Sequence, residues 1–423
     1  MKILRFLVVV VGVLVFEAPT YGVPPVVTNV AAKQRNGTKL IDITYDLDDQ
    51  DSKSVAVTID VSQDGGNFFD VPVSTLSGDF GSAVTPGVGK KIVWNVGLDW
   101  RERYTQTAVV RITAVDEKTD VPKGMVLVPG GSFVMGDTYA IESIAVPVRS
   151  VDVSAFYMDK YEVFATQWNE TYDWAVNKGG YKFTRSFYPV DRGPDFPVES
   201  VLWYDAVKWC NARSEREGLT PAYYKSATFN TQTVYRTGDI DVLEAWVQWT
   251  TNGYRLPTEA EWEKAARGGL KGQNFPWVSN GANFPPFFLK GYANWSDSGD
   301  AWGSNASLFT AGIETTPVGG YNGVRVNPGG LDMANGFGLY DMAGNVREWC
   351  WDGFRRDWYN SDPTPARDTH GPWPPVEPRF RVVRSGGWPF NPGPTFRCAG
   401  RDAEAADHSP PQRDIGFRTV RRK

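Results

Sequence analysis

Hydrophobic and polar positions alternate in four short runs between residues 26 and 117. The segments KLIDITYDL, SVAVTIDVS, KKIVWNV and TAVVRITAV carry a β-branched or aromatic residue at nearly every second position, as half-buried strands do. The turn sequences QRNG, QDGG and TPGVG separate them. The pattern therefore predicts an all-β sandwich over residues 26–117.

The length and spacing of these runs are typical of a fibronectin type III or immunoglobulin-like sandwich. No catalytic pattern occurs in this region, so we expect an accessory or spacer domain. The polar segment EKTDVPKG (117–124) predicts a linker, and a second domain over residues 121–423.

Two segments of the second domain have helical periodicity. The first covers about residues 204–217 and ends at Gly218. The second is predicted from RLPTEAEWEKAARGG, where Thr258 is the expected N-cap and Glu261 its capping-box partner. After Gly269 the sequence predicts about 150 residues of loops, rich in Trp, Gly and Asn, with few regular elements.

The first 22 residues predict a signal peptide. Lys2 and Arg5 precede an apolar run from Phe6 to Phe16, and small residues follow it. An uncleaved membrane anchor is the alternative. Cleavage would leave no transmembrane span, and we expect a protein that is secreted or located in the periplasm or cell envelope.

Composition narrows the possible partners. The formal net charge of −5 argues against a nucleic-acid partner, since phosphate binding requires clustered Lys and Arg. Three cysteines permit at most one intramolecular disulfide, so no disulfide framework is expected. The two histidines, His370 and His408, exclude a three-histidine metal site and weaken the case for a Ser-His-Asp triad.

Seven phrases occur in an order that resembles one family. They are GMVLVPGGSFVMG, KYEVFATQWNE, FPVESVLWYDAVKWCNARSEREGLTPAYY, GYRLPTEAEWEKAARGG, NGFGLYDMAGNVREWCWD, RVVRSGGW and DIGFRTVRR. Together they resemble the sulfatase-modifying factors, the formylglycine-generating enzyme family. The resemblance implies an α+β, mostly irregular domain related to C-type lectins, with structural calcium. It also implies a copper-binding cysteine pair that oxidises a sulfatase cysteine with dioxygen.

Calcium sites are expected from the same resemblance. In GLYDMAGNVREW it assigns to calcium the side chains of Asp341 and Glu348 and the carbonyls of Gly344 and Val346. Oxygen ligands of this kind suit calcium. In the alternative, Asp341 caps a turn and Glu348 pairs with an arginine. A second site would use the Asn294 side chain and the Trp295 carbonyl, but Ala311 replaces the usual family aspartate.

The copper site of the family has no counterpart here. Phe390 stands where the first cysteine would be, the second has no equivalent, and Cys398 matches a different position. Thiolates are the ligands that Cu(I) selects. We therefore expect no copper site and no copper-dependent oxidation, although the family is one of oxidoreductases.

A binding cleft remains as the expected functional site. In the relatives, the loop after the Gly-Gly turn lines the substrate cleft. Here it would present Trp388 and Phe390 near Arg397 and Arg401, a surface that suits a peptide, a protein or a carbohydrate. Three alternatives stay open: Trp388 and Phe390 fill the core, an oxidase uses other residues, or the β-sandwich does the binding.

Overall fold

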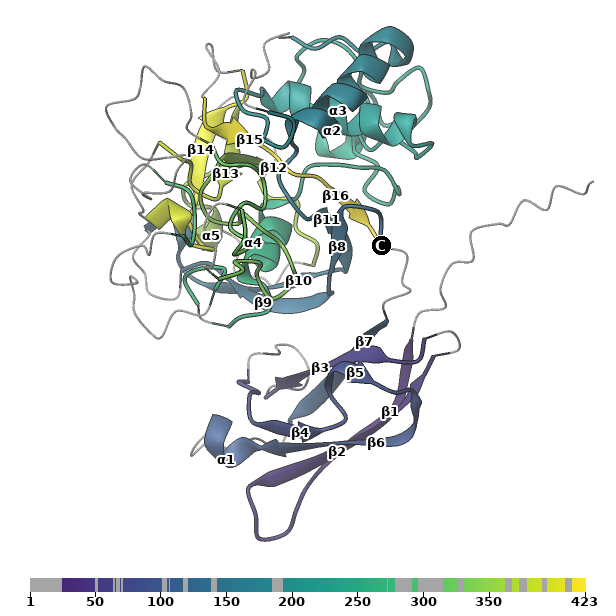
Figure 1. The fold of residues 1–423 in the computed structure, drawn as a ribbon, viewed down its shortest axis with the longest axis vertical. Coiled ribbons are helices and arrows are strands. Elements are labelled where there is room, and N and C mark those ends of the chain that lie inside the picture. The colour runs from purple at the N-terminus through teal and green to yellow at the C-terminus, as the bar shows by residue number, and fades with distance from the viewer. Residues whose placement is uncertain are drawn as a thin grey trace, which may run out of the picture. The chain divides into compact units, whose positions relative to one another are not determined.

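The structure is a computed structural model of the 423-residue chain (Figure 1). It describes residues 25–49, 52–63, 65, 69, 71–100, 105, 107–116, 121–137, 143–184, 193–271, 273–277, 291–295, 315–325, 331–361, 367–372, 379–389, 394–407 and 413–423. The chain forms two compact units. One comprises Met1–Val61, Val73–Tyr104 and Val109–Asp120, and the other comprises Ser62–Pro72, Thr105–Ala108 and Val121–Lys423.

The strands described in the N-terminal region form two sheets, which agrees with the predicted β-rich segment. The four-stranded sheet has the order β1-β2-β6-β4 and the three-stranded sheet the order β5-β3-β7. Their bounds are β1 Val26–Gln34, β2 Leu40–Asp48, β3 Val55–Ser62, β4 Leu76–Gly78, β5 Gly81–Val84, β6 Gly87–Asn95 and β7 Val109–Asp116; a short helix, α1, covers Val96–Asp99.

Alternate residues of these strands are buried. Ile43 and Tyr45 of β2 and Trp94 of β6 line one sheet, and Val55 and Val57 of β3 line the other. The Trp94 indole nitrogen also donates a hydrogen bond to Asp99 at 2.8 Å. A β-sandwich accounts for this alternation, because each sheet buries one face of its side chains.

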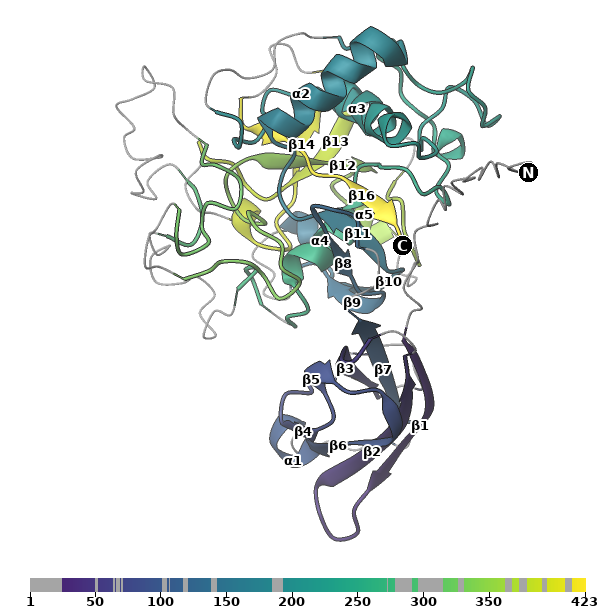
Figure 2. The same ribbon diagram turned by 45° about the vertical axis from the view of Figure 1, so that its right-hand side comes forward.

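The described residues of the C-terminal unit form three sheets and several helices, which confirms the α+β prediction (Figure 2). The sheet orders are β10-β9, β16-β11-β8 and β14-β13-β12-β15. The strands are β8 Met125–Val128, β9 Gly131–Met135, β10 Arg149–Val153, β11 Phe156–Asp159, β12 Arg347–Gly353, β13 Phe380–Arg384, β14 Asp402–Ala405, β15 Ile415–Gly416 and β16 Val420–Arg422.

The helices of this unit are α2 Ala165–Trp174, α3 Trp203–Arg216, α4 Glu259–Arg267 and α5 Trp358–Ser361, with a π-helical turn over Ala175–Gly179. Helix α4 begins as predicted. The Thr258 side chain accepts a hydrogen bond from the Glu261 backbone and the Glu261 carboxylate accepts one from the Thr258 backbone, and Gly268 ends the helix in a left-handed conformation.

The sheet β14-β13-β12-β15 lies between α3 and α4 (Figure 1). Trp349 and Trp351 of β12 pack in one apolar core with α3, whereas Cys350 packs in a second core with α4. All seven residues of β12 are buried. Burial on both faces explains why REWCWDG shows no alternation and why this strand was not identified from the sequence. The regular elements described after Gly269 are short, as the sequence predicted, and the strands among them are β12 to β16.

The predicted signal peptide, residues 1–22, lies outside the described residues. Within the described ranges, no helix is both long and apolar enough to cross a membrane.

Candidate ligand cleft and calcium site

The segment that follows β13, residues 385–389, is called the Trp388 turn here. Ser385 and Gly386 adopt positive φ values of 87° and 69°. A Cβ at Gly386 would lie 2.6 Å from the Phe396 ring, and one at Gly387 would lie 2.5 Å from Asp414 Oδ2. The turn therefore requires both glycines, since any side chain would displace a packed neighbour.

Trp388 is held by this turn and is 9% exposed. Its backbone N–H donates to the carbonyl of Asn345 at 2.8 Å. Its indole Nε1 is enclosed and has no hydrogen-bond partner in the described part of the chain. A buried indole usually satisfies its N–H, and that of Trp388 does not do so among the described residues. Phe390, predicted beside it, lies outside the described residues.

Arg397 and Arg401, also predicted near the cleft, are both 1% exposed. Arg397 donates to Asp137 at 2.8 Å. Arg401 forms a bidentate pair with Glu259 at 2.6 and 3.0 Å. Both guanidinium groups are therefore enclosed in ion pairs within the domain rather than exposed on a cleft wall.

Cys210, Cys350 and Cys398 are free thiols, and all three are fully buried. Burial raises the pKa of each thiol above its usual value. A buried neutral thiol is a poor nucleophile and a poor metal ligand. None of the three offers the accessible thiolate that copper chemistry requires.

Asp341 begins the predicted calcium segment. It is partly buried and adopts a positive φ of 56°, and its Oδ2 accepts a hydrogen bond from the Gly319 backbone at 2.6 Å. Burial raises the pKa of this carboxyl to about 6. Asp341 therefore ties a turn to a distant loop and still has a second carboxylate oxygen, Oδ1.

Glu348 lies on β12 and is fully buried. Its carboxylate oxygens accept hydrogen bonds from Arg418 at 2.7 and 2.8 Å, and Oε2 accepts a further one from the Trp262 indole at 2.8 Å. One alternative considered from the sequence was that Glu348 pairs with an arginine, and in the structure that arginine is Arg418. A calcium ion at Glu348 would share this carboxylate with Arg418.

The two predicted calcium segments meet in space. The Asn345 backbone donates to the Asn294 carbonyl at 3.1 Å, and the Asn294 amide donates to Asn345 Oδ1 at 3.3 Å. The Gly344 carbonyl accepts from the Ser385 hydroxyl at 3.1 Å. Val346 is completely buried next to this pair, and Trp295, which follows Asn294, is partly buried. The segments around Asn294 and Asn345 therefore form one polar centre beneath the Trp388 turn.

A third carboxylate, which sequence reasoning missed, belongs to this centre. Glu162 is fully buried and accepts hydrogen bonds from the Asn345 amide at 2.8 Å and the Val346 backbone at 3.2 Å. Burial raises the pKa of Glu162 well above its usual value, and the charges of Asp341 and Glu348 raise it further. The only sequence signal was a carboxylate inside the family phrase KYEVF.

The three carboxylates of this centre would attract a cation, but part of their negative charge is already offset within the protein. Arg418 acts on all three carboxylates and offsets one of their charges. In the described ranges, however, no three His, Cys, Asp or Glu side chains are placed to hold a metal ion together. A calcium ion would therefore depend on carbonyl and amide oxygens as well as on Asp341 and Glu348.

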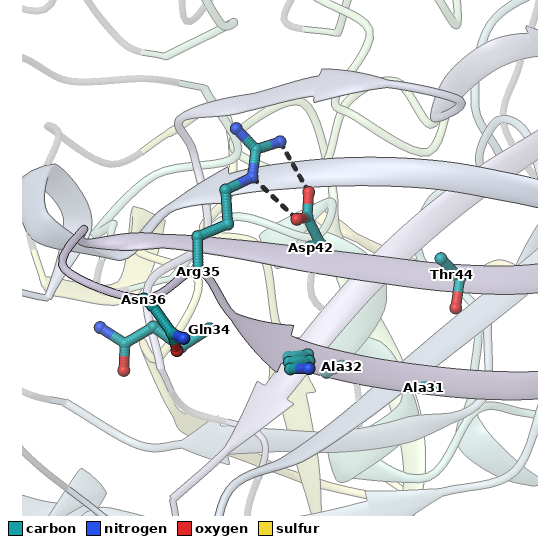
Figure 3. Close-up of a pocket in the computed structure, with 8 residues that line it drawn as sticks. Ala31, Ala32, Gln34, Arg35, Asn36, Asp42 and Thr44 are labelled. Atoms are coloured by element: carbon teal, nitrogen blue, oxygen red, sulfur yellow. Dashed lines mark hydrogen bonds and ion pairs between the residues drawn. The ribbon is translucent and has the colours of Figure 1, made fainter.

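Each of the two units has a hollow among its described residues. One is lined mainly by aromatic and apolar side chains next to Asp341, including Trp277, Tyr292 and Tyr340. The other, of about 570 Å³, lies on the β1–β2 hairpin and is open to solvent (Figure 3). It is lined by small and polar residues, and the Arg35–Asp42 ion pair, with two contacts of 2.7 Å, stands at its edge.

The comparison with known families defines the class of protein. A profile described as "Sulfatase-modifying factor enzyme 1-like domain" matches residues 112–423. The chain belongs to this family. The resemblance that the sequence phrases indicated is confirmed.

The individual proteins that this chain resembles carry different functional names. The chain is 34% identical to "Chaperone protein LppX" of Paenibacillus barcinonensis over 276 residues, which cover 64% of this chain and 80% of the relative. It is 31% identical over 271 residues to the "Formylglycine-generating enzyme" of Thermomonospora curvata, covering 60% and 79%. A solved structure, "Treponema denticola variable protein 1", is similar at 28% identity with a TM-score of 0.50, covering 71% of this chain and 95% of that one.

Proposed function

We propose that this chain is an exported sulfatase-modifying-factor family protein that binds a peptide, protein or glycan partner beside Trp388. In this proposal it does not carry out the copper-dependent oxidation of the family. The observation that carries the proposal is the burial of all three cysteines, which leaves no accessible thiol pair for Cu(I).

Two features support binding in place of oxidation. The Trp388 indole N–H has no hydrogen-bond partner among the described residues, so a ligand that reached it would find a donor there, and the 9% of Trp388 that is exposed would offer apolar contact. The relative named as a chaperone favours a protein partner within the proposed range. Export is proposed from the sequence of residues 1–22.

Calcium is proposed as a structural ion. Asp341, Glu348 and the carbonyls of Gly344 and Val346 would hold it, with Asn294 and Trp295 as candidates for a second site. A divalent cation would offset negative charge that Arg418 leaves uncompensated around Glu162. Its role would be to hold the Trp388 turn in place rather than to react.

The oxidation is tested with the purified chain, Cu(I) and a peptide containing Cys-x-Pro-x-Arg. We expect no aldehyde product by mass spectrometry. Because relatives 31% identical are named as formylglycine-generating enzymes, an oxidase using other residues is the alternative. Aldehyde formed with turnover would replace our proposal by that alternative.

Binding is tested on peptide and glycan arrays with the wild type, Trp388→Ala and a control. Phe229→Ala removes a 42% exposed aromatic ring that is tilted against Tyr224 and is not part of the Trp388 turn. We expect ligands that the wild type and Phe229→Ala retain and that Trp388→Ala loses. Equal binding by all three proteins would argue against a site at Trp388.

A further inference from the structure

Arg149 is the first residue of β10 and faces the interior of the C-terminal unit. It pairs with Met135 of β9, and Val151 and Val153, two and four residues further along the same strand face, are each 1% exposed. A guanidinium at such a position normally has an anionic partner, because burying an unpaired charge is unfavourable.

Among the described residues, no anionic partner contacts the Arg149 guanidinium. Its Nε, Nη1 and Nη2 atoms are all enclosed, and none of them makes a hydrogen bond within the described ranges. The guanidinium carbon lies 4.8 Å from the centroid of the Tyr359 ring and 5.4 Å from that of Trp358. Cation–π contacts stabilise the charge but leave the N–H donors unsatisfied.

Tyr359 contributes a second unused donor. It is 1% exposed, its ring also contacts the Arg401 guanidinium at 4.4 Å, and its enclosed hydroxyl has no hydrogen-bond partner in the described structure. The three nitrogen atoms of the Arg149 guanidinium and the hydroxyl of the ring that it contacts therefore have no hydrogen-bond partner among the described residues.

The nearby carboxylates already form ion pairs with other arginines. Glu259 is held by Arg401, with Arg384 at 3.4 Å, and Glu263 is held by Arg384 and Arg267. Burial raises the pKa of Glu259, but the charges of three arginines, Arg149 among them, outweigh it and hold the pKa below its usual value. Arg149 thus adds positive charge to a region whose anions already have partners.

We propose that Arg149 and the Tyr359 hydroxyl bind a small oxyanion, phosphate or sulfate, at the start of β10. The planar guanidinium presents its N–H groups in a fork that matches the oxygen atoms of such an anion. The phenol can donate to a third oxygen. This site goes beyond the proposed function, since it uses none of the residues assigned to the Trp388 turn or to calcium.

The first experiment measures thermal unfolding of the full chain in increasing inorganic phosphate or sulfate, against chloride at equal ionic strength. An anion that binds the folded state raises Tm by roughly 2–5 °C at 10–100 times its Kd. Calorimetric titration of the wild type with phosphate gives the Kd directly. A wild type that responds to phosphate and sulfate no more than to chloride overturns the proposal.

Three variants locate the effect. Arg149→Met removes the donors, so we expect it to lose the anion-dependent rise and to be at least as stable as the wild type in chloride, where the charge would be unpaired. Tyr359→Phe keeps the ring and weakens binding by roughly tenfold. Arg367→Met, at a 75% exposed side chain, is the control that keeps the full response.

The remaining outcomes are equally decisive. An Arg149→Met variant that keeps the anion response overturns the proposal. So does one that is strongly destabilised in chloride, because the guanidinium would then serve only the cation–π packing. If Arg149→Met does not fold, Arg149→Lys keeps the charge without the fork, and unchanged affinity in that variant overturns the proposal. A parallel titration with glycerol phosphate distinguishes a free anion from a phosphate ester, and a response to either one supports the site.

Discussion

Glu348 and Arg418 form a bidentate ion pair that is closed to solvent, with N–O distances of 2.7 and 2.8 Å and both side chains 0% exposed. The pair joins β12 to the segment between β15 and β16. Arg418 also donates to the Tyr340 carbonyl at 3.0 Å. The last residues of the chain are thereby linked to the polar centre beneath the Trp388 turn.

Replacing Arg418 should therefore destabilise the C-terminal unit strongly. Arg418→Met leaves the Glu348 charge buried without its main partner, so we expect a loss of about 3–5 kcal/mol in the free energy of unfolding. Urea unfolding followed by tryptophan fluorescence measures it. The exposed pair of Arg325 and Asp195 supplies the control: Arg325→Met should cost less than about 1 kcal/mol. Equal losses in the two variants would contradict the prediction.

Calcium removal should lower the thermal stability of the wild type. If Asp341 holds the ion, EDTA lowers Tm, added calcium restores it, and Asp341→Ala makes Tm insensitive to both. Asp195→Ala changes a carboxylate that is 48% exposed and should preserve the calcium response. A wild-type Tm that EDTA leaves unchanged would refute a stabilising calcium ion.

The thiols should be inert in the folded protein. Because Cys210, Cys350 and Cys398 are buried and their pKa values are raised, we expect no rapid reaction with a thiol reagent such as DTNB at pH 8. After unfolding in guanidinium, all three should react. A thiol that reacts within seconds in the native protein would reopen the question of cysteine chemistry.

The pH dependence of stability should reveal Asp352. Burial, with the charge of Glu259, raises the pKa of Asp352 to about 8 from an ordinary value of 3.8, although Arg401 opposes this and Glu261 adds to it. The folded state then binds the proton more tightly than the unfolded state. The stability from this group is complete below about pH 4 and is lost as pH rises through about 8.

Asp352→Asn should remove that loss. The neutral amide stays uncharged, so the variant should gain stability relative to the wild type between pH 4 and pH 8, by on the order of a few kcal/mol. Asp357→Asn, at a 69% exposed side chain, serves as the control. Parallel pH profiles of wild type and Asp352→Asn would show that Asp352 does not titrate as described.

Local features of this protein were predictable from the sequence. The capping box of α4 depends on residues three positions apart, Thr258 and Glu261, and the family phrases placed Glu348 and the Trp388 turn in one domain. Strand β12 was missed because burial on both faces removes the polar alternation by which strands are identified.

The sequence by itself determined the family, the alternating N-terminal strands, the capped helix and the lack of a cysteine pair. These depend on residue identity and short-range periodicity. Only the tertiary structure decided which charges meet: Glu348 with Arg418, Arg401 with Glu259, and Glu162 with Asn345. Only the folded structure shows that the Arg149 guanidinium is enclosed and that its N–H groups have no hydrogen-bond partner among the described residues. Such pairings depend on how distant segments pack, and nothing in the spacing of the residues along the chain encodes them.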